Sequence, residues 1–231
     1  MNELESLLQL NKMLLAESPQ YLAQAAAFPP DAEAQWRLFR SLVNVRAPRP
    51  AGGDFLALQD SLLQKITACK GVTAFHSLTP MQKGLYLWRG DITILQTDGI
   101  VNAANSGLTG CYHPCHQCID NAIHTFSGVQ LRLACASIIK AQGRPEPAGQ
   151  AKMTRAYNLP CRYVLHTVGP AVAGVLLPLL SCAGGKARAA LHRILLHLYR
   201  RISFSPPGSN GNRSQNRKRI FKCLSRAPGH F

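Results

Sequence analysis

The chain has 231 residues, enough for one domain of ordinary size with an extension, and 46% of them are hydrophobic, enough to build a core. No apolar run approaches the roughly 18 residues expected of a membrane span. The first residues also lack the basic region of a signal peptide. These features predict a cytoplasmic protein that has no membrane partner.

The formal net charge of +15 is concentrated in the last part of the chain, because all eleven acidic residues lie at or before Glu146. A strongly basic protein raises the possibility of a nucleic-acid partner. The basic tail, however, lacks the interleaved aromatic residues on which nucleic-acid bases stack. We therefore expect no specific nucleic-acid partner.

Three helices are predicted in the first third of the chain. Residues 2–17 carry leucines at helical spacing, a second helix begins after Pro29-Pro30-Asp31, and a third covers residues 54–69. Apolar stripes at this spacing usually pack into a core. Residues 1–78 are therefore expected to form a packed helical extension.

Strands are predicted to follow the helices. Residues 85–95 alternate and are rich in large apolar side chains, which predicts a strand that contains Asp91. After a tight Asp98-Gly99 turn, residues 100–104 read as a short strand buried on both faces.

One long helix is predicted over residues 117–140, although Gly128 weakens the helical pattern near its middle. A loop is expected over residues 143–149 and a strand over residues 163–168. His166, within that strand, is expected to be a hydrogen-bonded core histidine.

Five possible metal ligands occur in eight residues between Cys111 and Cys118. Thiolate and imidazole are the ligands that zinc prefers, and a site with three protein ligands keeps one coordination position open. The spacing of Cys111, His116 and Cys118 fits one ion around a tight loop. Apart from Cys111, Cys115 and Cys118, the other five of the eight cysteines are scattered along the chain, which favours reduced thiols. The alternative for the cluster is a set of buried cysteines and a loop histidine without metal.

Several short motifs occur in a fixed order: GDIT at 90–93, VNAANS at 101–106, the Cys/His cluster, IDNAIH at 119–124, and YNLP at 157–160 through HTVGP at 166–170. In this order the chain resembles a macrodomain, the ADP-ribose-binding α/β/α module. It is most similar to the microbial zinc-dependent branch of protein-ADP-ribose hydrolases. The resemblance implies a three-layer α/β/α fold with a mixed central sheet over residues 79–172.

The resemblance also implies roles for particular residues. Asp91 and Ile92 would hold the adenine base, and Asn105 would hydrogen-bond the distal ribose. Asn105 and Asn102 would be catalytic. Turn capping is the alternative role for Asn102. Asp120 and His124 lie one turn apart at a helix start, where an exposed or helix-capping role is as plausible as a role in the site.

The resemblance stops after residue 172, so the macrodomain is expected to be incomplete. The family continues with a loop of the Ile-Ser-Thr-Gly-Val type whose backbone N–H groups cradle the diphosphate. When the codons for residues 192–205 are read one nucleotide forward, they permit Ile-Ala-Phe-Cys-Cys-Ile-Ser-Thr-Gly-Val-Phe-His-Phe-Pro. This agreement indicates a frameshift between roughly residues 171 and 186. Residues 173–231 would then be an out-of-frame, basic and largely disordered tail.

Two functions compete for this chain. The first is a zinc-dependent hydrolase that removes ADP-ribose from mono-ADP-ribosylated protein side chains, impaired here because the diphosphate-binding loop is missing. The second is a non-catalytic module that binds ADP-ribose or an ADP-ribosylated protein. The metal cluster favours the hydrolase, because binding ADP-ribose needs no metal. The resemblance further implies a lipoyl-carrier protein and a sirtuin-type transferase as partners.

Overall fold

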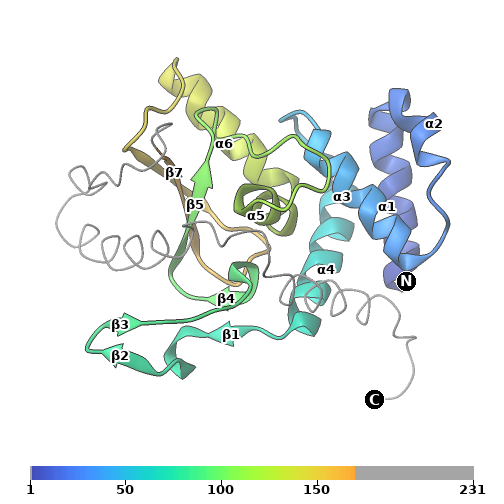
Figure 1. The fold of residues 1–231 in the computed structure, drawn as a ribbon. Coiled ribbons are helices and arrows are strands. Elements are labelled where there is room, and N and C mark those ends of the chain that lie inside the picture. The colour runs from blue at the N-terminus through green and yellow to red at the C-terminus, as the bar shows by residue number, and fades with distance from the viewer. Residues whose placement is uncertain (1, 170–231) are drawn as a thin grey trace.

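The computed structural model describes residues 2–169, in which a group of helices lies beside a mixed sheet (Figure 1). The helices are α1 (Glu3–Glu17), α2 (Leu22–Ala25), α3 (Ala32–Val45), α4 (Gly53–Lys70), α5 (Ile119–Ser127) and α6 (Val129–Gln142). The strands are β1 (Thr73–Ala74), β2 (Pro80–Gln82), β3 (Leu85–Tyr86), β4 (Leu95–Gln96), β5 (Gly99–Ala104), β6 (Ala151–Arg155) and β7 (Tyr163–Val168). Short 3₁₀ turns occupy Pro19–Tyr21, Phe75–Ser77 and Ile92–Ile94.

The three predicted N-terminal helices are present, and side chains cap the first two. Asn2 accepts a hydrogen bond from the backbone N–H of Glu5, while the Glu5 carboxylate accepts one from the backbone N–H of Asn2. Asp31 caps α3 in the same way, by accepting from the N–H of Ala34. These caps satisfy N–H groups that a helix start leaves without a partner.

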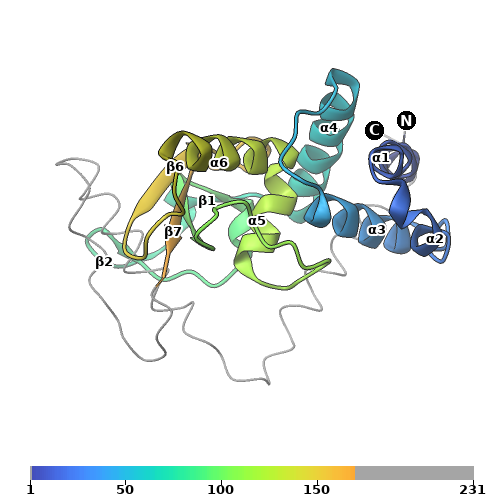
Figure 2. The ribbon, with the colours of Figure 1, turned by 90° about the horizontal axis from the view of Figure 1, so that it is seen from above.

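The N-terminal helices share one core with the rest of the described residues. Helix α1 packs against α3 and α4, and α3 packs against α5 (Figure 2). Trp36 of α3 stacks with Phe39 and contacts Phe126 of α5, with ring centroids 5.6 and 5.7 Å apart. One continuous cluster of buried side chains runs from Leu7 to Val164. The helical extension therefore buries apolar surface against the part of the chain that carries the predicted site.

The prediction of one strand over residues 85–95 is wrong. Only Leu85–Tyr86 and Leu95–Gln96 are extended, and Asp91 caps a 3₁₀ turn at Ile92–Ile94 by accepting from the N–H of Thr93. The indole of Trp88 also folds over Gly90, where a Cβ would overlap the ring. An Asp that bonds its own backbone competes with a strand ladder, and the apolar pattern does not reveal this.

The central sheet of the described residues has the order β5-β7-β6, with β7 parallel to β5 and antiparallel to β6. The expected mixed sheet and the strands near residues 100–104 and 163–168 are therefore confirmed. His166 pairs with Asn102 on one side and with Lys152 on the other. Strand β6 was not predicted.

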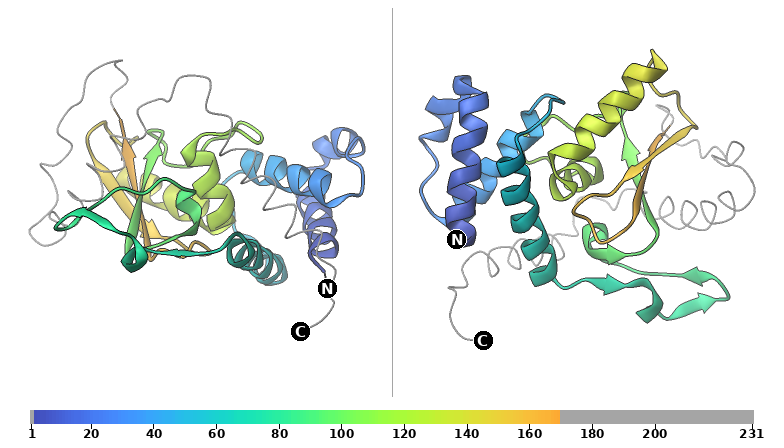
Figure 3. Two further views of the ribbon diagram at one scale, coloured as in Figure 1. Left: turned by 60° about the horizontal axis from the view of Figure 1, so that its bottom comes forward. Right: turned by 180° about the vertical axis from the view of Figure 1, so that it is seen from behind.

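Helices α5 and α6 cover one face of this sheet. Asp120 of α5 bonds Asn102 of β5, and the Cys135 sulfur of α6 lies 3.6 Å from Nε2 of His166. The views from below and behind show both helices beside the strands (Figure 3). The expected α/β fold, with helices packed on a mixed central sheet, is therefore confirmed.

The single helix expected over residues 117–140 is two helices bent by 111°. Gly128 separates them with a φ of 96°, in the left-handed region that favours glycine. A Cβ there would lie 2.6 Å from the Gln59 side chain and 3.1 Å from that of Asn158. The break thus lets α4 and the loop before β7 approach the helix junction closely.

Within residues 2–169, no single helix is long and apolar enough to cross a membrane, although the bent pair α5–α6 passes the same test jointly. Five cysteines in this range are free thiols, as expected, whereas Cys69 forms a disulfide. The expected frameshift, basic tail and missing diphosphate loop lie outside the described residues.

Candidate functional site

Residues 111–118 form a loop between β5 and α5, which we call the metal loop. The side chains of Cys111, His116 and Cys118 converge there, with their ligand atoms all within 4.8 Å of one another. The Cys111 sulfur lies 3.6 Å from Nδ1 of His116. Neighbouring ligand atoms of a tetrahedral zinc site lie about 3.5 Å apart. The donor types and spacing therefore fit a zinc ion.

Local structure places Cys118 at the start of α5. Its sulfur accepts the N–H of Asn121 at 3.4 Å, so Cys118 is the N-cap of the helix. Burial raises the pKa of the Cys118 thiol, while this N–H lowers it. The positive end of the helix dipole also favours a negative sulfur here.

Asn105 lies at the end of β5 and organises the turn that leads into the metal loop. Its Oδ1 accepts the N–H of Gly107 at 3.0 Å, and its Nδ2 donates to the carbonyl of Gly110 at 2.9 Å. The residue is exposed. One amide N–H and further lone pairs of the side chain remain for a ligand hydroxyl.

Asn102 is fully buried, unlike Asn105. Its Nδ2 donates to Oδ1 of Asp120 at 2.7 Å and lies 3.1 Å from Nδ1 of His166. Asn102 is thus hydrogen-bonded inside the protein through Nδ2, whereas its Oδ1 has no hydrogen-bond partner within residues 2–169. His166 is the hydrogen-bonded core histidine that we expected, with Nε2 2.9 Å from the hydroxyl of Thr154.

Asp120 and His124 are buried beside the metal loop, which excludes the exposed face that was one of the two alternatives for them. Burial raises the pKa of Asp120 to about 6, while Asn102 and Arg132 lower it. Nε2 of His124 lies 3.5 Å from Asp120, too poorly aligned for a hydrogen bond, and neither ring nitrogen has a hydrogen-bond partner within residues 2–169. A Cβ on Gly110, whose φ is 82°, would lie 2.7 Å from this ring, so the loop entry requires glycine.

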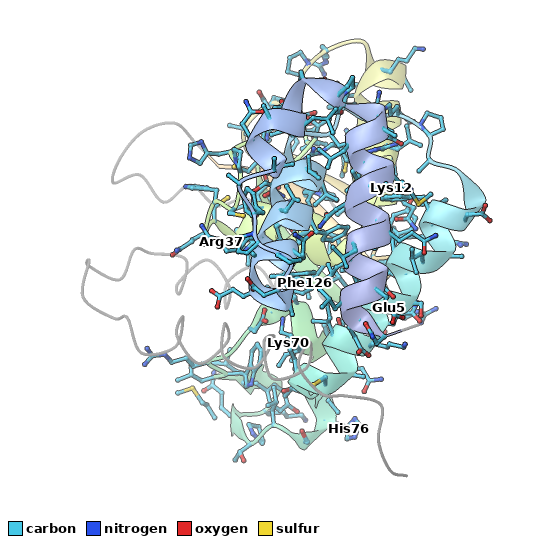
Figure 4. The ribbon with its side chains drawn as sticks, turned by 90° about the vertical axis from the view of Figure 1, so that its right-hand side faces the viewer. Glu5, Lys12, Arg37, Lys70, His76 and Phe126 are labelled. Atoms are coloured by element: carbon cyan, nitrogen blue, oxygen red, sulfur yellow. The ribbon has the colours of Figure 1, made fainter. Side chains whose placement is uncertain are left out.

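Asp91, the expected adenine contact, is contacted by Lys70 at the end of α4. The Asp91 carboxylate pairs with Nζ of Lys70 and accepts from the N–H and hydroxyl of Thr93. The Lys70 ammonium also lies 3.9 Å from the centroid of the Phe126 ring. Both residues are labelled in the side-chain view (Figure 4). Ile92 follows in the 3₁₀ turn and is buried.

Comparison with known proteins decides the family. The profile of the macro domain family matches residues 101–182. A Treponema medium protein named protein-ADP-ribose hydrolase is 51% identical over 180 residues, which cover 76% of this chain and 68% of the relative. The chain belongs to the macrodomain family.

Other relatives of this macrodomain are matched over a smaller share of their length. A Staphylococcus aureus (strain MSSA476) protein with the same name is 49% identical over 145 residues, 62% of this chain and 54% of the relative. The Trypanosoma brucei macrodomain in complex with ADP-ribose is 30% identical, with coverage of 57% and 59% and a TM-score of 0.39. A TM-score this low does not establish a common fold by itself, so the family assignment rests on the sequence identity.

Three arginine and lysine side chains near the macrodomain site were missed by the sequence analysis. Lys70 supports Asp91, Arg40 of α3 contacts the metal loop, and the Arg132 guanidinium of α6 lies 4.3 Å from the Tyr112 ring centroid. Burial lowers the pKa of Arg40 and of Arg132, while nearby thiols raise both. For Arg40 a signal existed, because Arg37, Arg40, Ser41 and Asn44 form a polar stripe at helical spacing opposite the apolar one.

The buried histidines predict how stability depends on pH. Burial lowers the pKa of His166 from 6.5 to about 4, so between these values the unfolded chain binds a proton that the native state does not. The contribution of His166 to the free energy of unfolding is therefore constant above pH 6.5. Between pH 6.5 and about 4 this contribution falls by about 1.4 kcal/mol for each unit by which the pH drops. Urea unfolding at several pH values measures the slope.

Two neighbours modify this slope. His124, whose pKa burial lowers further, adds to it, whereas Asp120, whose pKa burial raises, opposes it. His166→Gln removes the titration of His166 and also the charge of His166 that lowers the pKa of His124, so the variant is expected to lose less stability between pH 6.5 and 4. An identical slope in the variant would show that His166 is not the group responsible.

Proposed function

We propose that this macrodomain is a zinc-dependent hydrolase that removes ADP-ribose from mono-ADP-ribosylated protein side chains. The observation that carries the proposal is the convergence of Cys111, His116 and Cys118 in a loop whose first turn is hydrogen-bonded to Asn105. The relatives at about half identity that are named protein-ADP-ribose hydrolase support the same reaction class.

The chain's own residues would position the substrate. Asn105 shares a hydrogen bond with the carbonyl of Gly110, the residue directly before Cys111, so an amide that binds the distal ribose is fixed relative to the metal ligands. Asp91 and the N–H of Ile92 would hold the adenine at the other end of the ligand. Holding a substrate in a reactive geometry can supply much of a catalytic effect.

Zinc held by Cys111, His116 and Cys118 would supply a Lewis acid, or orient a water, beside the distal ribose. Cys118 suits this role because it caps the start of α5, where the helix dipole favours a thiolate.

The alternative is a module that binds ADP-ribose without turning it over. The loop that would cradle the diphosphate is not encoded after residue 172 in the present reading frame, and its loss would weaken ADP-ribose binding as well as turnover. We propose accordingly that the hydrolase is impaired in this form. The proposed partners are a lipoyl-carrier protein and a sirtuin-type transferase.

Metal analysis tests the site directly. The purified protein is expected to contain close to one equivalent of zinc, and Cys111→Ala and Cys118→Ala to contain almost none, because two ligands do not hold the ion. Inductively coupled plasma mass spectrometry of each protein gives the ratio.

Cys115→Ala is the matched control, because Cys115 lies in the same loop but outside the converging cluster. It is expected to keep its zinc. Equal metal content in all three variants and the unmodified protein would contradict the ligand assignment.

A further inference from the structure

The metal loop lies against helix α3 of the N-terminal extension. The side chains of Arg40, Ser41 and Asn44, together with the backbone carbonyl of Arg37, contact it. The spacing of these three side chains places them on one face of the helix. The opposite stripe, which contains Trp36 and Phe39, is buried in the core.

Arg40 makes two contacts with the metal loop and the start of α5. Its Nη2 donates to the carbonyl of His116 at 3.3 Å and to Oδ1 of Asn121 at 2.7 Å. Asn121 in turn donates its backbone N–H to the Cys118 sulfur and its Nδ2 to the carbonyl of His113 at 3.1 Å. One guanidinium therefore reaches the backbone of one proposed ligand and the hydrogen-bond donor of another.

Asn44 holds the middle of the same loop. Its Oδ1 accepts the N–H of Cys115 at 2.9 Å, and Cys115 has a φ of 53°, which is uncommon for a residue other than glycine. The Cys115 sulfur also contacts the carbonyl of Arg37 and the hydroxyl of Ser41, each at 3.4 Å. An unfavourable backbone conformation persists only where the surroundings fix it.

The α3 face is itself anchored to the sheet side of the molecule. Nη1 of the buried Arg132 donates to the carbonyls of Val43, Asn44 and Arg46, at 3.0, 2.7 and 2.6 Å. These are carbonyls that the end of α3 leaves without helical partners. Helix α3 is therefore fixed relative to α6 and can act as a rigid support for the loop.

We propose that Arg40 is a positioning residue of the metal site, which fixes the metal loop from the N-terminal extension. The inference rests on the proposed function in so far as the loop binds zinc. Hydrogen bonds from outside the ligand set orient metal ligands, and their loss typically weakens metal binding by about 10–100-fold. The helical extension is then part of the functional site rather than an appendage.

The test compares three variants of the full chain. Arg40→Met removes the guanidinium and keeps an apolar stem, and Arg40→Lys keeps the charge without the planar fork. Arg37→Met is the matched control one turn earlier, because the Arg37 side chain is exposed and points away from the helix (Figure 4). Competition with a chromophoric chelator gives the zinc Kd of each protein, and the absorption spectrum of the cobalt-substituted form reports the ligand geometry.

We expect Arg40→Met to raise the zinc Kd by about 10–100-fold and to alter the cobalt spectrum. Arg40→Lys should fall between it and the unmodified protein, and Arg37→Met should match the unmodified protein. Thermal melts of Arg40→Met and Arg37→Met separate this effect from a general loss of stability. An unchanged Kd and cobalt spectrum in Arg40→Met would overturn the proposal.

Hydrogen–deuterium exchange of the metal-free proteins distinguishes failure of this inference from failure of the proposed function. Peptides that cover residues 111–118 should exchange faster in Arg40→Met than in Arg37→Met. If the unmodified protein binds no zinc, the metal proposal fails. The exchange comparison is then the remaining test of the positioning role of Arg40, and equal exchange rates in both variants would refute that role.

Discussion

Restoring the reading frame between residues 171 and 186 is expected to raise the rate of ADP-ribosyl hydrolysis by several orders of magnitude. The residues proposed for the base, the distal ribose and the metal are encoded before this point, whereas the loop for the diphosphate is not. Positioning of a substrate can contribute about 7–11 kcal/mol to lowering a barrier. Each 1.4 kcal/mol corresponds to about tenfold in rate.

Both forms would be assayed on a mono-ADP-ribosylated protein in the presence of zinc. The restored protein with Cys118→Ala is the control, because it keeps the new loop and loses a metal ligand. Arginines of the basic tail attract a diphosphate but do not hold a sugar in a reactive position. Similar rates for the present and the restored chains would show that the loop is dispensable or that the frame interpretation is mistaken.

Asp91→Ala is expected to destabilise the protein by about 3–5 kcal/mol, because it leaves a buried ammonium without its counter-charge. The Lys70 side chain is only 1% exposed, and it pairs with Asp91. Burial lowers the pKa of Lys70, and Asp91 raises it. Urea unfolding of the variant and the unmodified protein at pH 7 measures the difference.

The double variant Lys70→Met/Asp91→Leu is the control. Replacing a buried ion pair with apolar side chains is often neutral or stabilising, so the double variant should recover most of the lost stability. A loss below about 1 kcal/mol in Asp91→Ala would mean that Lys70 is solvated or finds another partner. If Lys70 supports Asp91 as proposed, Lys70→Met should also weaken ADP-ribose binding.

The convergence of Cys111, His116 and Cys118 was predictable from the sequence, because the three residues lie in one short loop. Cys111, His116 and Cys118 are separated by so few residues that a turn and a helix start suffice to bring them together. The N-terminal helices and the strands at residues 99–104 and 163–168 were predictable for a similar reason, since their apolar periodicity is local.

The helix break and the irregular segment around Asp91 were not predictable from periodicity. At Gly128 the close approach of Gln59 and Asn158 requires a residue without a Cβ, and both come from distant parts of the chain. At Asp91 the carboxylate bonds Thr93 and Lys70 instead of joining a strand, and Lys70 is 21 positions earlier in the numbering.

The sequence by itself determined which candidate donor groups lie close together along the chain, and the tertiary structure decided which other residues contact them. Sulfur, imidazole and amide donors are set by residue type and short spacing, so they can be read along the chain. Whether Asn102 faces a ligand or Asp120, and whether Arg40 faces solvent or the metal loop, depends on packing between α3, α5 and the sheet. Hydrogen bonds between residues more than 70 positions apart form only when the apolar core has brought those elements together.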